Sequence, residues 1–533
     1  MLYGARVAVD SLYKAILKCG TFDEYHLFFN SPTVARRFKK NLSALDVDEK
    51  RIRLIKIDEL VPYLQKTRYT VFFVNDISVL SELSYLRARF AKANFPICSM
   101  AHSVCYGWML KESFLDNLVS DTRPFDSIIC TSRAQLKAMR SLNRLVGGYS
   151  RRMAGLNVRY RGRLDLLPLG VDAGSYGRRS KISARKGLRL PRNKKIILYF
   201  GRFSIFDKMD LHPVLIAFRE LARKDKNLLL LFAGRDEQGR YGRKIKRMAR
   251  GMGLSSRTRF FLNPSLKNKY LLYAASDIFL SPSDNIQESF GLTILEAMAA
   301  GLPVVASDWN GYRDIVLHGK TGFLAPTYWT DCDGAISYLS RLKACVFGDW
   351  MQDLLYLAQA LSVDARETVR RLSLLIKDER LRLELGRNGR ARVLKKYDWK
   401  VLMPEYERLW KKLSALSERY RAPESGREML IPRYFKCFRH YPTRILAGGD
   451  KVAISDNGTE YLKDKKDLGC PDSLRDLLSM SVIFEMLSSL AAKKASTVSA
   501  AEEGAKKVFK KRSLDNLRYH IMWLLKKDLI RVV

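Results

Sequence analysis

Two carboxylates, Glu288 and Glu296, flank the apolar stretch "ESFGLTILEAMAAGLPVVAS". On one continuous helix, residues eight apart lie roughly 80° apart in rotation and more than two turns along the axis, which is too far for a carboxylate pair. The preceding "SPSDNIQESFG" contains the helix breakers Pro282 and Gly291, however, and reads as a loop. We therefore predict a helix from about Gly291 to Ala300, with Glu288 just before it and Glu296 about one turn inside it.

Such a helix start suits an extended polar ligand. The N–H groups of Phe290, Gly291 and Leu292 lie at the predicted helix N-terminus, where they can donate to hydroxyl or phosphate oxygens, and Gly291 permits close approach. Glu288 can accept hydrogen bonds from sugar hydroxyls, and Glu296 can bind both hydroxyls of a ribose. The alternative is that two acids at this spacing are ordinary charges on a helix surface.

Two cations follow another strand-like run. In "GRFSIFDKMD", Arg202 and Lys208 stand in a loop at the carboxyl end of a predicted strand. Arginine through its planar fork and lysine as a point charge can together clamp a diphosphate. They would also stabilise negative charge on a departing phosphate, and losing one such group typically costs about 10²–10³ in rate. A pair of surface cations is the alternative in so basic a chain.

The elements that position these residues alternate between strand and helix patterns. In the middle of the chain, strand-like runs such as "KKIILYFG", "NLLLLFAGR" and "PVVASD" are separated by helical patterns. Because the runs are continuously apolar, they predict a parallel sheet covered on both faces. The runs "YTVFFVND", "FPICSMAHS" and "FDSIICTS" predict a second such domain. We expect two doubly wound α/β domains facing a cleft, with His102, Arg202 and Glu288 at the carboxyl ends of strands.

The chain opens on a helix pattern with no strand-like run before it, in "MLYGARVAVDSLYKAILKCG". A doubly wound domain normally starts with a strand. Either this domain lacks its first strand, or the true start lies upstream of Met1. Gly4 is expected in the first strand-to-helix turn.

The last hundred residues differ in character. The segment "YPTRILAGGDKVAISDNGTEYL" predicts a hairpin-rich piece with turns at Gly448-Gly449 and Asn457-Gly458. Two helical patterns follow, Ser481 to Lys494 and Ser513 to Lys527. That order resembles a winged-helix module, and a small helical appendage packing on the body or on a partner is equally open.

The composition is that of a globular chain. Of 533 residues, 47% are apolar and 11% aromatic, enough for two or three domains. No stretch of about 18 apolar residues and no secretory start is visible, so we expect a cytoplasmic protein. The cysteines are scattered without ligand-like spacing, which argues against a zinc site or a disulfide framework; they are Cys19, Cys98, Cys105, Cys130, Cys332, Cys345, Cys437 and Cys470.

A formal charge of +40, from 95 Lys and Arg against 55 Asp and Glu, predicts attraction to polyanions or anionic surfaces. Positive charge is concentrated in the Arg-rich segment 139–163, "MRSLNRLVGGYSRRMAGLNVRYRGR", which has seven arginines and no carboxylate. Two interpretations are open: a solvated basic loop, or a contact with an anionic lipid or acceptor, which would place the protein peripherally on the inner face of a membrane.

The motifs together resemble a known family. The run from Ile196 to Pro326 is similar to the donor-binding half of the retaining glycosyltransferases of family four, through "LYFGRFSIFDK", "LLLLFAGR", "SPSDNIQESFGLTILEAMAAGLPVVAS" and "GYRDIVLHGKTGFLAP". A looser likeness extends from about Tyr3 to about Arg421. The resemblance implies the GT-B fold: a Rossmann-like acceptor-side domain at 1–180, a donor-binding domain at 181–395 and a closing helix at 396–421. The appendage at 422–533 lies outside it.

Carried onto this sequence, the resemblance implies roles for single residues. Arg202 and Lys208 would bind the donor diphosphate, Glu288 the donor sugar and Glu296 the nucleotide ribose. Gly4 would match a glycine near the donor phosphates. His102 would match a histidine near the donor sugar and acceptor, with a core histidine as the alternative.

The sequence departs from the family pattern at three places. Met209-Asp210 replace the usual glycine after the lysine, and the Arg-to-Lys spacing is one residue longer than its commonest form. The first strand is missing. Extra helical sequence, "GDWMQDLLYLAQALSVDARETVRRLSLLIKDERL", precedes the closing region.

The expected activity is transfer of a hexose-type sugar, with retention, from a nucleoside diphosphate sugar to a hydroxyl of a glycan or lipid-linked acceptor, in cell-surface glycan or glycolipid synthesis. We expect no cofactor and no metal, because the two cations can neutralise the diphosphate as a divalent ion does elsewhere. The region from Tyr397 to Leu413 is expected to cross back over the first domain.

Two other functions stay open. The first is a nucleic-acid-binding regulator, in which the tail reads DNA and the body senses a sugar nucleotide. Against it, the tail's cations form a run before the last helix rather than lining its face; they are Lys506, Lys507, Lys510, Lys511 and Arg512. The second is a sugar phosphorylase or synthase-like relative that would release a free sugar phosphate.

Overall fold

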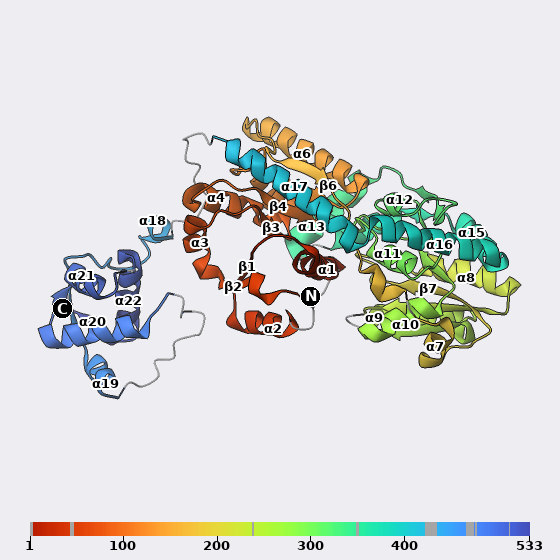
Figure 1. The fold of residues 1–533 in the computed structure, drawn as a ribbon. Coiled ribbons are helices and arrows are strands. Elements are labelled where there is room, and N and C mark those ends of the chain that lie inside the picture. The colour runs from red at the N-terminus through yellow and green to blue at the C-terminus, as the bar shows by residue number, and fades with distance from the viewer. Residues whose placement is uncertain are drawn as a thin grey trace. The chain divides into compact units, whose positions relative to one another are not determined.

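The computed structural model describes residues 4–42, 47–177, 179–236, 239–347, 351–421, 434–464, 474, 477–510 and 512–533. Contacts divide the chain into two compact units, Met1–Met429 and Leu430–Val533. Figure 1 shows the elements of both. Each unit is described by itself.

A six-stranded parallel sheet in the order β12-β11-β10-β7-β8-β9 forms the centre of the second half of the large unit. Its strands are β7 (Lys195–Phe200), β8 (Leu228–Gly234), β9 (Thr258–Leu262), β10 (Ile278–Ser281), β11 (Val304–Ser307) and β12 (Gly322–Ala325). Every residue of β8 is buried, as a strand covered on both faces requires. The strand and helix alternation predicted for this part of the chain is confirmed.

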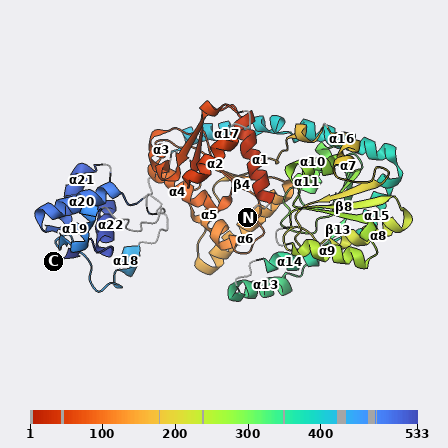
Figure 2. The ribbon, with the colours of Figure 1, turned by 90° about the horizontal axis from the view of Figure 1, so that it is seen from below.

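Helices cover both faces of this sheet (Figure 2). They are α7 (Lys181–Gly187), α8 (His212–Lys224), α9 (Arg240–Gly251), α10 (Leu266–Ala275), α11 (Leu292–Ala299), α12 (Tyr312–Ile315), α15 (Ala365–Lys377) and α16 (Glu379–Lys396). Successive side chains of β7 enter different cores: Ile196 and Leu198 belong to one apolar cluster, Ile197 and Tyr199 to another. This alternation follows from the two-residue period of a strand and shows that the sheet is doubly wound.

The first half of the large unit holds two parallel sheets, β1-β2 and β3-β4-β5-β6. Their strands are β1 (Tyr25–Phe29), β2 (Ile52–Lys56), β3 (Phe72–Val74), β4 (Ile97–Ala101), β5 (Ser127–Cys130) and β6 (Arg163–Leu166). The helices are α1 (Gly4–Cys19), α2 (Pro32–Leu42), α3 (Leu60–Lys66), α4 (Leu80–Phe90), α5 (Asp116–Val119) and α6 (Arg133–Ala154). Strands β3, β4 and β5 were predicted; β1, β2 and β6 were not.

Helix α17 (Trp399–Arg419) returns to the first half and packs on α1. The indole N–H of Trp399 donates to the hydroxyl of Ser11 at 2.8 Å, and the N–H of Thr21 donates to Glu407 at 2.5 Å. Trp410 is buried in the same cluster as Leu12. The first domain therefore completes its core with residues from the far end of the unit.

Helices α13 (Asp333–Phe347) and α14 (Gln352–Ala360) stand between β12 and α15, and the extra helical sequence, 348–381, contains α14 and α15. A short antiparallel pair, β13 (Thr327–Tyr328) and β14 (Ser362–Val363), brackets the two helices. They are therefore an insertion between the last strand of the sheet and the helices behind it.

The Arg-rich segment 139–163 is mostly helical, because α6 runs to Ala154 and ends at Gly155 in a left-handed conformation with a φ of 67°. The interpretation of this segment as a loop is wrong. Ser132 caps the helix by accepting a hydrogen bond from the N–H of Gln135 at 3.1 Å, the usual N-cap geometry.

The small unit is a three-stranded antiparallel sheet with helices. The sheet order is β16-β15-β17, and the elements are α18 (Tyr434–Phe438), β15 (Lys451–Ile454), α19 (Asp456–Asp464), α20 (Met480–Lys493), β16 (Ser496–Thr497), α21 (Val498–Val508), α22 (Leu514–Lys526) and β17 (Ile530–Val532). Helices α20 and α22 match the two predicted patterns. The unit has an apolar core of its own, which includes Ile483, Leu517 and Trp523.

One predicted turn is confirmed and one is wrong. Gly448-Gly449 form a turn, but Asn457-Gly458 lie inside α19. The reason is local capping: the hydroxyl of Ser455 accepts from the N–H of Gly458 at 3.0 Å and so starts a helix where a hairpin was expected. Of the tail's basic run, Lys511 lies outside the described residues.

In the part of the chain that the structure describes, no helix is long and apolar enough to cross a membrane.

Candidate active site

A cavity of about 310 Å³ lies where strand ends of the two halves of the large unit meet. Its lining includes His102, Arg202, Lys208 and Glu288, four residues singled out in the sequence, and runs on through Phe290, Gly291 and Leu292 to Thr293. His102 follows β4, Arg202 follows β7, and Glu288 stands between β10 and α11. The carboxyl ends of parallel strands thus bring together residues far apart in the chain.

Lys208 and Glu288 form an ion pair inside this cavity. The hydroxyl of Tyr312 also donates to Glu288, at 3.3 Å. Burial alone would raise the pKa of Glu288, but the charge of Lys208 and its hydrogen bond outweigh burial and hold that pKa below its usual value. The N–H of Phe290 donates to the same carboxylate. Glu288 is therefore ionised, and its carboxylate already has three hydrogen-bond donors within the protein.

Arg202 is held by three acceptors. Its guanidinium lies 3.1 Å from the carboxylate of Asp207 and donates at 3.0 Å both to the Asp207 carbonyl and to the side-chain oxygen of Gln287. Asp207 is itself buried. The two cations of the expected clamp therefore each face a carboxylate.

The helix start has the predicted form. α11 begins at Leu292 and ends at Ala299, and its N-cap is Gly291 with a φ of 122°. A side chain at this position is disfavoured by that φ, and a Cβ there would lie 2.8 Å from the ring of Tyr312. Glycine is therefore required by backbone conformation and packing, independently of any ligand.

Glu296 lies apart from the cavity lining, one turn beyond Thr293. It is buried, and its carboxylate accepts from the ammonium of Lys269 at 2.5 Å and from the hydroxyl of Tyr273 at 2.8 Å. The structure thus places Glu296 on the predicted helix, in a separate ion pair next to the cavity. Its proposed contact with a ribose stays a prediction.

Gly4 is the first residue of α1, and the cavity lining reaches α1 at Ala8, one turn further on. Its expected role beside the donor phosphates is not tested by this geometry.

His102 lines the cavity with a partly buried ring. Burial lowers its pKa, although the nearby Asp76 and a hydrogen bond with the backbone of Asn75 oppose this. Its Nε2 atom is buried and has no hydrogen-bond partner among the described residues. A neutral imidazole with one unsatisfied nitrogen is the arrangement that a hydroxyl group of a substrate can complete.

Sequence reasoning missed several polar residues of the site, among them Asp76, Tyr106, Asp207 and Gln287. Asp76 comes two residues after β3 in "VND". The rule that located His102, that ligands bind at the carboxyl ends of parallel strands, which we call the strand-end rule, could have found it too. Asp207 stands beside Lys208. No local signal marks Tyr106 or Gln287, whose side chains meet across 181 positions of sequence.

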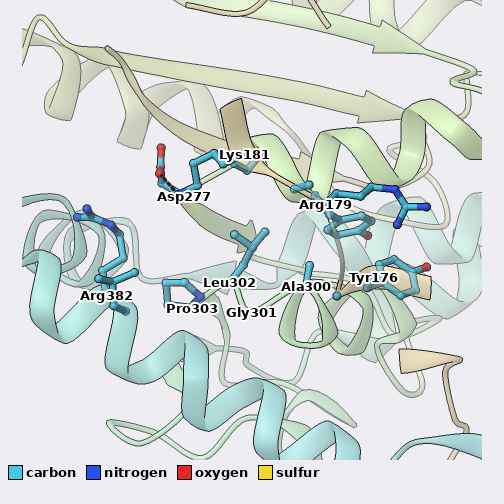
Figure 3. A pocket seen from close by; sticks show the side chains of 14 residues that line it. Tyr176, Arg179, Lys181, Asp277, Ala300, Gly301, Leu302, Pro303 and Arg382 are labelled. Atoms are coloured by element: carbon cyan, nitrogen blue, oxygen red, sulfur yellow. Dashed lines mark hydrogen bonds and ion pairs between the residues drawn. The ribbon is translucent and has the colours of Figure 1, made fainter. Parts of the chain in front are cut away.

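A second cavity, of about 170 Å³, lies at the amino ends of strands β10 and β11, opposite the end that faces the first cavity (Figure 3). Its charged lining consists of Arg179, Lys181, Arg382 and Asp277. Lys181 pairs with Asp277 at 2.7 Å, and Arg382 donates to the carbonyl of Leu375 at 2.9 Å. Arg179 donates to the carbonyl of Ser175, so all three cations have partners within the protein.

No group of three or more His, Cys, Asp or Glu side chains able to hold a metal occurs in the residues that the structure describes.

Comparisons with known proteins agree with this geometry. Residues 180–343 match the family model described as Glycosyl transferases group 1. The D-inositol 3-phosphate glycosyltransferase of Nocardia farcinica is 31% identical over 188 residues, which cover 33% of this chain and 40% of that protein. Its counterpart in Xylanimonas cellulosilytica is 31% identical over 186 residues, covering 33% and 43%. The chain thus spans less than half the length of these relatives.

Among solved structures, Anabaena Alr3699/HepE in complex with UDP aligns with a TM-score of 0.52 at 16% identity, covering 77% of this chain and 96% of that one. The same protein in complex with UDP-glucose aligns with a TM-score of 0.51 at 17% identity, covering 78% and 97%. At such identities the likeness concerns the fold. The predicted GT-B fold, two doubly wound domains facing a cleft, is confirmed, and the match over 180–343 supports the resemblance to group 1 glycosyltransferases.

Proposed function

We propose that this chain transfers a sugar from a nucleoside diphosphate sugar to a hydroxyl group of an acceptor. The observation that carries the proposal is the convergence of Arg202, Lys208, Glu288 and His102 on one cavity. The match of residues 180–343 to group 1 glycosyltransferases supports it independently.

The ion pairs of the site suggest how the donor is bound. When the diphosphate enters, its oxygens replace Glu288 as the partner of Lys208 and compete with Asp207 for Arg202. The released carboxylate of Glu288 then accepts hydrogen bonds from hydroxyls of the donor sugar. The same exchange leaves two cations beside the leaving nucleoside diphosphate, where they stabilise the charge that develops as the glycosidic bond breaks.

His102 is proposed to contact the sugar. Its unpartnered Nε2 accepts a hydrogen bond from a hydroxyl of the donor sugar or of the acceptor, and the lowered pKa keeps the ring neutral at pH 7. Glu296 is proposed to hold the ribose after Lys269 has moved, and Gly4 to lie near the donor phosphates. Residues 1–180 are proposed as the acceptor side and 181–395 as the donor side.

The finer features are also proposals. A hexose-type sugar, retention at the anomeric carbon and a glycan or lipid-linked acceptor follow from the resemblance. The Anabaena structures hold UDP and UDP-glucose, so these are the first donors to test. Transfer is proposed to need no metal, and activity that is unchanged by EDTA supports this. The anomeric proton coupling of the product, read by NMR, tests retention.

The decisive experiment is a screen of nucleoside diphosphate sugars for thermal stabilisation, because a ligand that binds the native state raises its apparent stability. A donor that stabilises the parent should fail to stabilise Lys208→Ala. The matched control is Lys224→Ala, which removes an exposed lysine from a surface pair with Glu220. Equal stabilisation of the parent and Lys208→Ala contradicts the assignment of the site.

Product analysis separates the alternatives. Release of a nucleoside diphosphate supports the transferase, and release of a free sugar phosphate supports a phosphorylase. For the nucleic-acid-binding regulator, the test is the chain without residues 430–533: transfer that survives the deletion supports a transferase with an appended unit. A salt-dependent shift of duplex DNA that the deletion abolishes favours the regulator.

A further inference from the structure

Helix α6 carries an unusual concentration of one charge. Its 22 residues include six cations and no carboxylate; the cations are Arg133, Lys137, Arg140, Arg144, Arg151 and Arg152. All six are exposed. Arg133 approaches Asp314 of the donor-side half at 3.9 Å, so the free charge of the helix lies from Lys137 onward.

The same helix exposes a row of large apolar side chains. Leu145, Tyr149 and Met153 follow one another at intervals of four residues and are 54%, 54% and 69% exposed. Leu156, just beyond the helix end, is 51% exposed. Single exposed apolar residues are common on protein surfaces, but residues four apart on a helix are neighbours and form a continuous stripe.

The stripe lies between the buried face and the cations. At about 100° per residue, Leu145, Tyr149 and Met153 span roughly 80° of the helix circumference. Val146 and Met139, both buried, lie on one side of this stripe. The other side carries the row Lys137, Arg140, Arg144 and Arg151. Figure 1 shows α6 along the outside of the first half of the large unit.

We propose that α6 docks this protein on an anionic lipid bilayer. The apolar stripe enters the boundary between headgroups and acyl chains, and the cation row lies against the lipid phosphates. This is the arrangement by which amphipathic surface helices bind membranes, through apolar area combined with attraction to anionic lipids. The net charge of +40 adds attraction over the whole molecule.

A second strongly basic helix, α9, shows that charge alone does not produce this pattern. Its exposed cations are Arg240, Arg243, Lys244, Lys246, Arg247 and Arg250. Its apolar residues turn inward, with Ile245 and Ala249 buried in the core of the sheet. α9 is therefore a solvated basic face without an apolar stripe, and it provides a matched control for charge.

The docking does not depend on the proposed sugar transfer and is tested without it. The full chain is sedimented with vesicles of phosphatidylcholine containing about one third phosphatidylglycerol, and with pure phosphatidylcholine, at about 0.15 M salt. The parent is expected to bind the mixed vesicles at least about tenfold more strongly than the neutral ones, because several cations contribute roughly fivefold each.

Two variants of α6 separate the apolar and the charged contributions. Combining Leu145→Asp, Tyr149→Asp and Met153→Asp should abolish binding to the mixed vesicles. Combining Arg140→Gln, Arg144→Gln and Arg151→Gln should weaken it at least tenfold. The control combines Arg243→Gln, Lys244→Gln and Arg247→Gln in α9, and it should change binding less than threefold. All nine positions are exposed, and an unchanged melting temperature verifies that each variant is folded.

Three results overturn the proposal. In the first, the variant with aspartates at positions 145, 149 and 153 binds the mixed vesicles as strongly as the parent. In the second, the α9 variant loses as much binding as the arginine variant, which would make the attraction a diffuse effect of net charge. In the third, the parent ignores vesicles but shifts a short DNA duplex in a way that the α6 arginines control, which would make nucleic acid the partner.

Discussion

The side-chain amide of Gln287 donates to the phenol oxygen of Tyr106 at 2.7 Å. Tyr106 follows β4 in the first half of the large unit, and Gln287 precedes α11 in the second, so this bond joins the two halves across the cavity. The oxygen of the same amide accepts from Arg202 at 3.0 Å. One amide thus couples a residue of the proposed diphosphate clamp to the opposite domain.

Tyr106→Phe tests this coupling. The change removes the hydroxyl but keeps the ring, which stacks on Trp108 at a centroid distance of 6.0 Å. We expect donor binding to weaken about two- to tenfold, because a neutral hydrogen bond contributes roughly 0.5–1.5 kcal/mol. The measurement is the KM for the donor, with Tyr328→Phe as control, since Tyr328 bonds Asp364 on the surface. A control variant that changes KM as much as Tyr106→Phe contradicts the coupling.

Lys208→Met should lower turnover by about 10²–10³ and also lower the melting temperature. The second effect arises because the change leaves the carboxylate of Glu288 buried without its cation. Adding Glu288→Gln to Lys208→Met should restore much of the lost stability without restoring turnover. If the double variant melts below the single one, the two residues do not act as a coupled pair.

The raised pKa of Asp284 predicts that the free energy of unfolding decreases as pH rises. Burial raises its pKa to about 8, whereas the unfolded chain ionises near 4. Between these values the folded state holds a proton that the unfolded state has released, so stability decreases as pH rises through this window. Urea unfolding at pH 5 and pH 8 should show Asp284→Asn gaining on the order of 3 kcal/mol over the parent between the two conditions. The exposed Asp58→Asn should show no such gain.

The lowered pKa of His520 predicts that the small unit becomes less stable as pH falls. Its Nε2 accepts from the N–H of Ser479 at 2.9 Å, its Nδ1 lies 2.7 Å from the carbonyl of Asn516, and the side chain is fully buried. Burial lowers its pKa despite the hydrogen bond to Asn516. The unfolded state therefore gains a proton first as pH falls below about 6.5, and stability is lost.

The measurement for His520 is amide hydrogen exchange of peptides from 480–510 and 512–533 in the full chain. After correction for the intrinsic rate, protection in the parent should fall from pH 7 to pH 5.5, and in His520→Gln it should stay level. The exposed His440 supplies the control position. If a variant at His440 removes the pH dependence of protection, His520 is not its cause and the prediction is wrong.

The sequence predicted the large sheet well because its strands are short apolar runs buried on both faces. It failed for β1 and β2, whose burial is partial. In "IRLIK" the charged residues Arg53 and Lys56 interrupt the apolar ones, so neither a continuous apolar run nor a strict alternation marks the strand. The turn expected at Asn457-Gly458 failed because the capping hydroxyl of Ser455 favours a helix there.

For the site, the strand-end rule was sufficient to gather His102, Arg202, Lys208 and Glu288. It could not predict which partners their charges would have. Lys208 and Glu288 are 80 positions apart in the sequence, and Glu296 and Lys269, which also form an ion pair, are 27 positions apart. Such pairs depend on how loops and helices fold back on one another, and local pattern contains no information about that.

The return of α17 to α1 constrains how the chain can be made. Trp399, Glu407 and Trp410 complete contacts that begin with Ser11, Thr21 and Phe22. A ribosome adds roughly 5–20 residues per second, so the amino-terminal domain waits some tens of seconds for its last helix, with part of its core uncovered. Chaperone dependence during synthesis, and a refolding phase limited by docking of this helix, are the expected result.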